Sequence, residues 1–318
     1  MRGPRIRNDR EECFLHCFNR AAGWKEDEFF DDVDKEHLYR LALDLQKFYS
    51  IDIISFVCMS NHWHAVVCTH PEVPDREEVE GRFTDFYGAS RVAPNWADPG
   101  VVKEYGQRMR NVSCFVKDLQ QRFTCWYNRT HQRRGRLWAD RYKSVVLDGN
   151  HALWECLKYV EMNPVRAGYC EDAADYRFCS WGRYCGSGRH PFAAAFHKHL
   201  ARYHSDKGND LSLEDVACLL RTELARVAAS ERGESTEEIE GAQKEAASGV
   251  PFELCVTRRK RYWTDGAIIG SKDFVRNFSA AFFGEERTRH KRLARSSSDS
   301  VGDAPLYSFR QLRTTPSY

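Results

Sequence analysis

The sequence predicts an α+β protein in which helices pack against an antiparallel β-sheet. Runs rich in β-branched and aromatic residues alternate, along the first half of the chain, with segments whose apolar residues recur at helical spacing. The predicted order is β-α-β-β-α-β-α, and a short turn joins the two central strands, as antiparallel pairing allows. The 318 residues are enough for one large domain, or for one domain with a substantial extension.

The first predicted strand and helix follow a charged N-terminal arm at residues 1–12. The apolar run at 13–20 predicts a buried strand, although its two cysteines and its histidine also allow a metal cluster. Residues 35–50 have the spacing of an amphipathic helix, with Asp34 as the expected N-cap. The apolar positions of this helix are Leu38, Leu41, Ala42, Leu45 and Phe48.

Two more strands follow this helix. Residues 51–59 are rich in β-branched side chains, Ser60 and Asn61 indicate a turn, and residues 62–69 return as the next strand. Residues 71–110 contain several prolines and glycines, so we interpret them as an insertion. The insertion holds two short helical patches, at 77–87 and 101–109.

An amphipathic helix at 111–128 leads into a basic loop at 129–143. Seven lysines and arginines but one aspartate lie between Arg122 and Lys143. Positive charge interleaved with aromatic rings is typical of surfaces that bind single-stranded nucleic acid, where cations follow the backbone and rings stack on bases. The loop is therefore a candidate DNA-binding surface.

A short strand and one more helix complete the predicted order. The strand covers residues 144–147, and the helix runs to Asn163 with Asp148 or Asn150 as its N-cap. Pro164 is expected to end the helix, because a residue before proline resists the α conformation.

Composition narrows the class of protein further. A net charge of +2 hides an uneven distribution of acidic and basic residues. No apolar run is long enough for a membrane span, and the N-terminal residues lack the apolar core of a secretory signal. The twelve cysteines include no Cys-x-x-Cys pair, which favours reduced thiols in a cytoplasmic protein without a membrane partner.

Two pairs of polar residues stand out as a candidate site. His62 and His64 alternate on a predicted strand, so they point to the same face and can form half of a metal site. Tyr159 and Asn163 lie one turn apart on a predicted helix, at the edge of the face that packs on the sheet. That apolar face consists of Leu153, Cys156, Leu157 and Val160.

A series of motifs along the chain resembles a known family. The motifs are Met-Ser-Asn-His-Trp-His at 59–64, Gly-Arg-Leu-Trp at 135–138, Arg-Tyr-Lys-Ser at 141–144, Lys-Tyr-Val-Glu-Met-Asn-Pro-Val-Arg-Ala-Gly at 158–168, and Tyr-Arg-Phe-Cys-Ser-Trp at 176–181. The series resembles the single-tyrosine HUH transposases, most of all their REP-associated branch, from about residue 4 to 192. It departs at Ser60, often proline in that family, and in the insertion at 71–110.

The resemblance implies a fold and a chemistry. The fold is the HUH endonuclease fold, a ferredoxin-like antiparallel sheet with packed helices. Tyr159 is implied to be the nucleophile that forms a 5′-phosphotyrosine with single-stranded or hairpin DNA. The implied ligands of a divalent metal, Mg²⁺ or Mn²⁺, are His62, His64 and Asn163. The implied activity is that of a DNA transposase, acting as a monomer or homodimer in a bacterial-type, nucleoid-associated cytoplasmic setting.

The basic loop supplies the expected DNA contacts. Arg141 and Lys143 are candidates for holding phosphates, and Trp138 and Tyr142 are candidates for stacking on bases. The predicted DNA-binding residues are Arg129, Arg133, Arg134, Arg136, Trp138, Arg141 and Lys143.

The resemblance leaves the C-terminal part of the chain unexplained. We expect a transposase domain at 1–192, an accessory module that is a candidate for DNA binding at 193–295, and a disordered, serine-rich tail at 296–318. The accessory module includes the basic cluster Arg258–Arg261. Two alternatives stay open: a non-catalytic, sequence-specific DNA-binding protein that keeps the fold, and a zinc-stabilised regulator. The intact set of histidines, tyrosine and asparagine favours the enzyme.

Overall fold

The computed structural model has an α+β fold divided into two compact units. The structure describes residues 6, 10–23, 28–205, 211–233, 262–288, 293–295 and 306–309. The histidine unit comprises residues 8–143 and 174–196, and the tyrosine unit comprises residues 1–7, 144–173 and 197–318. Among the described residues, no helix combines the length and apolar character that crossing a membrane requires.

The sheet of the histidine unit is antiparallel, as predicted. Its strands are β1 (Cys13–Arg20), β2 (Ile51–Cys58) and β3 (His62–Thr69), and β3 pairs with both of the others. Arg20 lies opposite His62 and Phe18 opposite His64 in the β1–β3 ladder. The strands are almost entirely buried, which explains their runs of apolar and β-branched residues.

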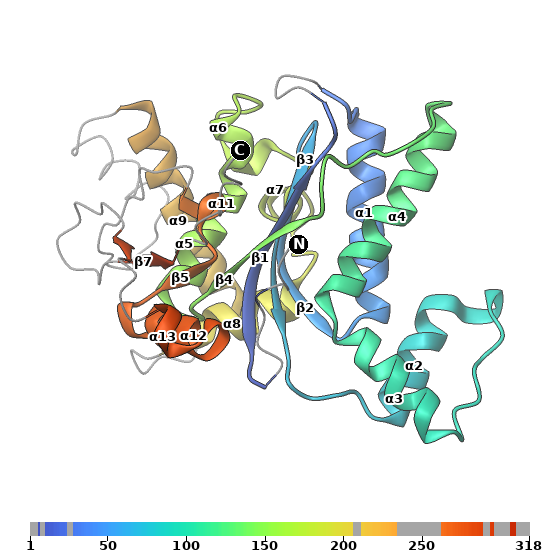
Figure 1. Cartoon of the computed structure of the whole chain (residues 1–318). Coiled ribbons are helices and arrows are strands. Elements are labelled where there is room, and N and C mark those ends of the chain that lie inside the picture. The colour runs from blue at the N-terminus through green and yellow to red at the C-terminus, as the bar shows by residue number, and fades with distance from the viewer. Residues whose placement is uncertain are drawn as a thin grey trace, which may run out of the picture. The chain divides into compact units, whose positions relative to one another are not determined.

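Two long helices pack side by side against this sheet (Figure 1). They are α1 (Asp32–Phe48) and α4 (Val112–Thr130). Helix α1 begins three residues earlier than predicted, because Asp31 rather than Asp34 is the N-cap. Asp34 takes the other half of a capping box: each carboxylate accepts the backbone N–H of the other residue.

The insertion forms a helical excursion from the histidine unit. Both predicted patches are helices, α2 (Arg76–Tyr87) and α3 (Pro99–Met109), with a short 3₁₀ turn, η1 (Gly88–Ser90), after α2. Phe83, Trp96 and Tyr105 make edge-to-face contacts between them. The last helix that lies wholly in this unit is α7 (Ser180–Ser187), whose Ser180 hydroxyl accepts the backbone N–H of Phe56 on β2.

The tyrosine unit contains a mixed sheet. Strand β4 (Lys143–Leu147) runs parallel to β5 (Ile268–Gly270), which pairs antiparallel with β7 (Tyr307–Phe309), and β7 pairs antiparallel with β6 (Ala294–Arg295). The expectation of an antiparallel sheet therefore holds for the histidine unit but not here. Gly270 allows this packing, since a Cβ there would lie 2.5 Å from Cβ of Asp148.

Helices from distant parts of the sequence complete the tyrosine unit. They are α5 (His151–Glu161), α6 (Asn163–Arg166), the 3₁₀ turn η2 (Ala173–Asp175, at the unit boundary), α8 (Ala193–Ser205, which begins in the histidine unit), α9 (Leu213–Arg232), α11 (Tyr262–Asp265), α12 (Lys272–Phe283) and α13 (Glu285–Thr288). Helix α9 packs on α5. This grouping differs from a division at residue 192, because residues from 197 onward share a unit with 144–173. The cluster Arg258–Arg261 and most of the predicted tail lie outside the described residues.

Candidate functional site

His62 and His64 lie on the face of β3 that points away from α1. Trp63 between them points to the other face, where Phe56 stacks on it and also contacts Tyr39 of α1. The two imidazole centroids are 5.2 Å apart and the ring planes are nearly perpendicular, at 85°. The predicted alternation thus places both histidines side by side.

Each of these imidazoles makes a hydrogen bond through its Nδ1 atom. Nδ1 of His62 is 2.7 Å from the amide oxygen of Asn61, and because that oxygen only accepts, the imidazole donates. Nδ1 of His64 is 2.8 Å from Nε2 of His16 on β1. Because each Nδ1 is engaged, Nε2 is the nitrogen by which each ring could bind an ion, and the pair fits as half of a metal site.

Both imidazoles are neutral near pH 7. Burial, together with the neighbouring charge of Arg20, lowers the pKa of His62 from 6.5 to about 4. Burial lowers the pKa of His64 well below its ordinary value, and the nearby His16 and His62 act in the same direction. Because a metal binds only the unprotonated ring, neither ligand has to lose a proton at neutral pH.

Tyr159 and Asn163 belong to the tyrosine unit. Nδ2 of Asn163 donates to the carbonyls of Tyr159 (3.0 Å) and Val160 (3.1 Å). Those acceptors require the nitrogen of the amide to face the helix, so Oδ1 is the atom by which Asn163 could bind a metal. The side chain thus covers the end of α5, which stops at Glu161 rather than at Asn163.

The ends of α5 differ from the sequence expectation in detail. Asn150 occupies the N-cap position without making a side-chain capping bond, and a carboxylate oxygen of Asp148 accepts the backbone N–H of Ser271 instead. Pro164 lies in the first turn of α6, where its missing N–H costs no hydrogen bond. The helix therefore breaks at Met162 and resumes at Asn163.

Tyr159 is more enclosed than its predicted position at a helix edge suggested, with 8% of its surface exposed. The Arg166 guanidinium lies 5.2 Å from the centroid of its ring, and the indole of Trp263 lies 6.1 Å away. Arg166 also donates to the Tyr159 carbonyl (3.0 Å) and pairs with Glu231 of α9 (2.6 Å). Sequence reasoning missed these neighbours, since Trp263 and Glu231 are remote in the chain.

A buried ionic cluster lies beside Tyr159. Lys158 contacts Glu155 (2.5 Å) and Glu223 of α9 (2.6 Å), and Arg226 makes two hydrogen bonds to Glu223. Burial opposes the charge on Lys158, yet the two carboxylates outweigh it and raise the pKa of that amine. Only the helical spacing of Glu155 and Lys158 was visible in the sequence.

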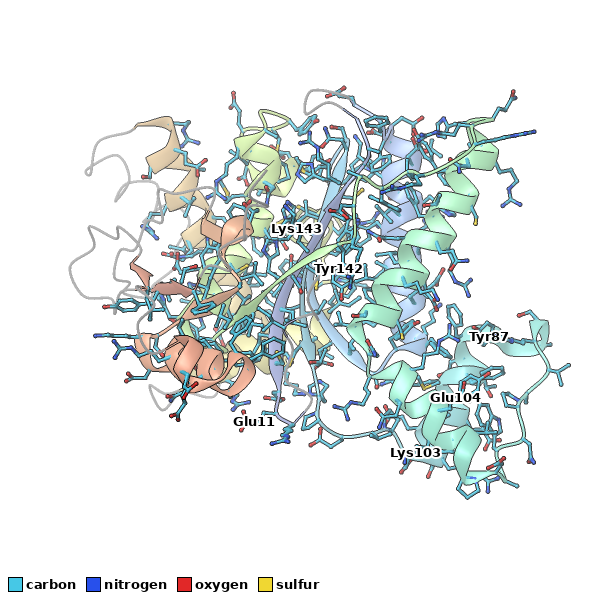
Figure 2. The ribbon with its side chains drawn as sticks, in the orientation of Figure 1. Glu11, Tyr87, Lys103, Glu104, Tyr142 and Lys143 are labelled. Carbon is cyan, nitrogen blue, oxygen red and sulfur yellow. The ribbon has the colours of Figure 1, made fainter. Side chains whose placement is uncertain are left out.

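The basic loop presents cations, while its aromatic residues belong to the core (Figure 2 labels Tyr142 and Lys143 at its end). Trp138 packs on Phe30 and Phe123 and donates from Nε1 to the carbonyl of Gln120. Tyr142 is also buried. The exposed cations are Arg129, Arg134, Arg136, Arg141 and Lys143, and Arg133 is half-buried over the Tyr127 ring.

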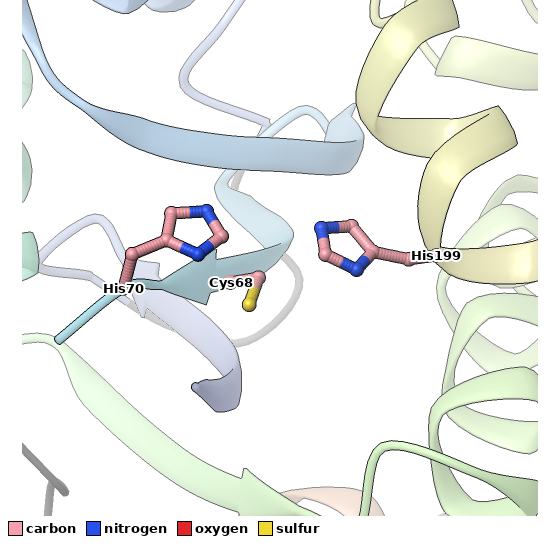
Figure 3. Close-up of side chains that lie close together, drawn as sticks. All are labelled: Cys68, His70 and His199. Atoms are coloured by element: carbon pink, nitrogen blue, oxygen red, sulfur yellow. The ribbon is translucent and has the colours of Figure 1, made fainter. Parts of the chain in front are cut away.

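Among the described cysteines, none belongs to a ligand group with His62 or His64, as a zinc-stabilised regulator built on these histidines would need. Cys13 and Cys17 alternate with His16 on β1 and therefore point to the opposite face. At the end of β3, His70 bonds to Asp52 (2.9 Å) and lies 3.4 Å from Glu12. Figure 3 shows Cys68 and His70 from this region, together with His199, a residue of α8 that belongs to the tyrosine unit.

The structure thus builds the two halves of the predicted site separately, each within its own unit. No protein-family model matches the chain, and no curated protein matches it. Among solved structures, the chain is similar to that of a REP-associated tyrosine transposase bound to a REP hairpin. The TM-score is 0.40 and the identity 12%, over 59% of this chain and 87% of the other.

Proposed function

We propose that the protein is a metal-dependent single-strand DNA endonuclease and strand transferase that acts on hairpin-forming DNA, as a transposase does. The observation that carries the proposal is the paired geometry of His62 and His64. Their rings share one strand face and both Nδ1 atoms are hydrogen-bonded, which makes Nε2 the nitrogen by which each ring would bind an ion. A strand whose only task is packing has no need for two such imidazoles.

Tyr159 is the proposed nucleophile. Its phenolic oxygen attacks the scissile phosphorus, a 5′-phosphotyrosine forms, and the bond to the 3′ oxygen breaks, so that this oxygen leaves as a 3′-hydroxyl. Attack by another 3′-hydroxyl reverses the step and rejoins strands without ATP, because the phosphodiester energy is kept in the covalent intermediate. Arg166, above the Tyr159 ring, holds the ring in place.

His62, His64 and Asn163 would hold the divalent ion, through two Nε2 atoms and one amide oxygen. This donor set with added phosphate and water oxygens suits Mn²⁺ or Mg²⁺. When bound, the ion supplies polarisation of the scissile phosphate. The exposed arginines and Lys143 of the basic loop follow the DNA backbone.

The decisive experiment uses short labelled hairpins, Mn²⁺ and denaturing gels. The wild type should yield a covalent protein–DNA adduct that maps to the peptide carrying Tyr159. Tyr159→Phe removes the hydroxyl but almost no volume, so it should bind the hairpin as tightly and form no adduct. Tyr169→Phe is the matched control, because Tyr169 is a 40% exposed tyrosine of the same unit. An adduct on another tyrosine refutes the assignment.

The enclosure of Tyr159 favours a second candidate function, that of a non-catalytic, sequence-specific DNA-binding protein. A nucleophile with 8% of its surface exposed must be uncovered before DNA can reach it. The two functions separate in the same experiment. Tight hairpin binding by the wild type with no cleavage in Mn²⁺ or Mg²⁺ selects the binding protein.

A further inference from the structure

We propose that His16 and Asn61 are positioning residues that set the tautomers of the two metal ligands His64 and His62. The inference rests on the proposed function and deepens it. A neutral imidazole carries its hydrogen on one nitrogen and offers the other to a metal. Whichever group bonds to Nδ1 therefore decides whether Nε2 can be a ligand.

Asn61 settles the tautomer of His62. Its amide oxygen lies 2.7 Å from Nδ1 and can only accept, so the hydrogen of His62 resides on Nδ1. Asn61 is itself buried, with 7% of its surface exposed, so bulk water competes poorly for this bond. The lone pair of Nε2 is then the one that His62 presents.

His16 contacts His64 from a different strand, through a hydrogen bond that either imidazole could donate. The two ring planes are within 14° and their centroids are 5.0 Å apart, as expected for two imidazoles joined edge to edge by an N–H···N bond. His16 is fully buried, and Phe18 lies against both rings. For Nε2 of His64 to bind an ion, its Nδ1 must donate, so Nε2 of His16 must accept.

This arrangement gives each ligand its own partner. His16 reaches His64 diagonally across the β1–β3 ladder, in which His64 lies opposite Phe18. Asn61 reaches His62 from the turn directly before β3. The two ligands therefore enter the site with rings already oriented, and neither has to change tautomer when an ion binds.

The test compares two substitutions of His16 in the full-length chain. In His16→Gln, Oε1 can stand where Nε2 stood and accept the same hydrogen bond, whereas His16→Leu removes the acceptor. Mn²⁺ affinity is measured by isothermal titration calorimetry at pH 7.5, with thermal melting as a check on folding. We expect His16→Leu to weaken Mn²⁺ binding about 10–100-fold. His16→Gln should stay within about threefold of the wild type, given the same principle.

Ring ¹⁵N spectra of the metal-free protein report which nitrogen of each histidine carries the hydrogen, a property that a loss of packing alone would not change. They should show His62 and His64 with hydrogen on Nδ1 in the wild type and in His16→Gln, and a tautomer mixture for His64 in His16→Leu. His190→Asn is the control, since His190 is a buried histidine of the same unit that makes its own separate bond to Phe192.

The outcomes separate this inference from the proposed function. Mn²⁺ binding that is equally tight in His16→Leu and the wild type overturns the role of His16, and leaves the proposed metal site standing. A wild-type spectrum with hydrogen on Nε2 of His64 also overturns the role of His16. A wild type that binds no Mn²⁺ overturns both the inference and the metal-dependent function. If His16→Leu and His16→Gln lose Mn²⁺ affinity equally and both have lowered melting temperatures, His16 is a packing residue only.

Discussion

The two units support their chemical groups in different ways. The imidazoles of His62 and His64 are oriented by Asn61 and His16, which come from the same small sheet and its turn. Tyr159 instead contacts Arg166 and Trp263 through its ring. Arg166 is in turn held by Glu231 of α9. One half of the site is thus built by strand pairing that joins residues up to 48 positions apart. The other half depends on Glu231, 65 positions from Arg166, and on Trp263, which is more remote still.

The two surroundings also differ in charge. The two imidazoles of the histidine half are neutral, since burial holds their pKa values low, and the charge beside His62 is that of Arg20. The tyrosine helix carries a buried cluster in which Lys158 and Arg226 are balanced by Glu155 and Glu223. Neutral imidazoles attract an ion with their lone pairs, whereas a paired ionic cluster holds two helices together. The difference suggests that each half can be broken without the other.

The largest effect should come from removing both imidazoles. The double variant His62→Ala, His64→Ala should lose cleavage completely and bind no Mn²⁺, yet bind hairpin DNA within about threefold of the wild type, because the basic loop is untouched. Calorimetry and gel-shift assays measure the two properties. Tyr159→Phe is the reciprocal control, with Mn²⁺ binding kept and the adduct lost. Undiminished cleavage by the double variant in Mn²⁺ contradicts the metal site.

Breaking the buried ionic cluster should destabilise the tyrosine unit. Glu223→Ala removes a carboxylate from the fully buried side chains of Lys158 and Arg226, which costs about 3–5 kcal/mol of unfolding free energy. Urea unfolding followed by tryptophan fluorescence measures this change.

The matched control for that cluster is an exposed ion pair. Lys47 and Asp44 on α1 are each 56% exposed, so Lys47→Met should change the unfolding free energy by less than about 1 kcal/mol. Mn²⁺ affinity should be unchanged in Lys47→Met, and His62 and His64 should still bind Mn²⁺ in Glu223→Ala, because the histidine half has its own support. A Glu223→Ala protein as stable as the wild type would show that the cluster does not hold α9 on α5.

Acid should weaken the metal-free histidine unit. Burial lowers the pKa values of His62 and His190 from 6.5 to about 4. Between pH 6.5 and pH 4 the unfolded chain protonates these histidines and the folded protein does not. Their contribution to the free energy of unfolding is therefore complete above about pH 6.5 and is lost as the pH falls toward 4. The slope approaches about 1.4 kcal/mol per pH unit for each histidine.

Urea unfolding in EDTA at pH 7 and pH 5 measures this loss. His190→Asn removes one of these titrations, and its amide oxygen can still accept the backbone N–H of Phe192. The variant should therefore show a smaller loss of stability between the two pH values. Equal pH dependence in the variant and the wild type would exclude His190 as a contributor.

The smallest effect concerns single cations of the basic loop. Arg134→Gln should weaken hairpin binding modestly and lower the slope of log affinity against log salt by about 0.7, as expected for one phosphate contact to a single strand. Lys103→Gln, on α3 of the same unit, should change neither the hairpin affinity nor its salt dependence (Figure 2). Single-stranded hairpins should outcompete blunt duplex at the same salt concentration. Tighter binding to the duplex would contradict the proposed substrate.

Local pattern was enough to determine much of this protein. The period of two in β3 put His62 and His64 on one face, and the helical period put Tyr159 one turn before Asn163. The order of elements through α5 also followed from the sequence, since periodicity and turn residues act over a few positions. The cap of α1 was misplaced by three residues because Asp31 and Asp34 can both accept backbone N–H groups.

Tertiary structure decided what surrounds these residues. Trp138 looked like a base-stacking residue in a basic loop, yet it completes a core with Phe30 and Phe123, contacts that no local pattern encodes. Three contacts join residues that are 48 to 104 positions apart: Lys158 pairs with Glu223, Trp263 lies against Tyr159, and His16 bonds to His64. Such contacts depend on how strands and helices pack, because burial and hydrogen bonding are properties of the assembled fold.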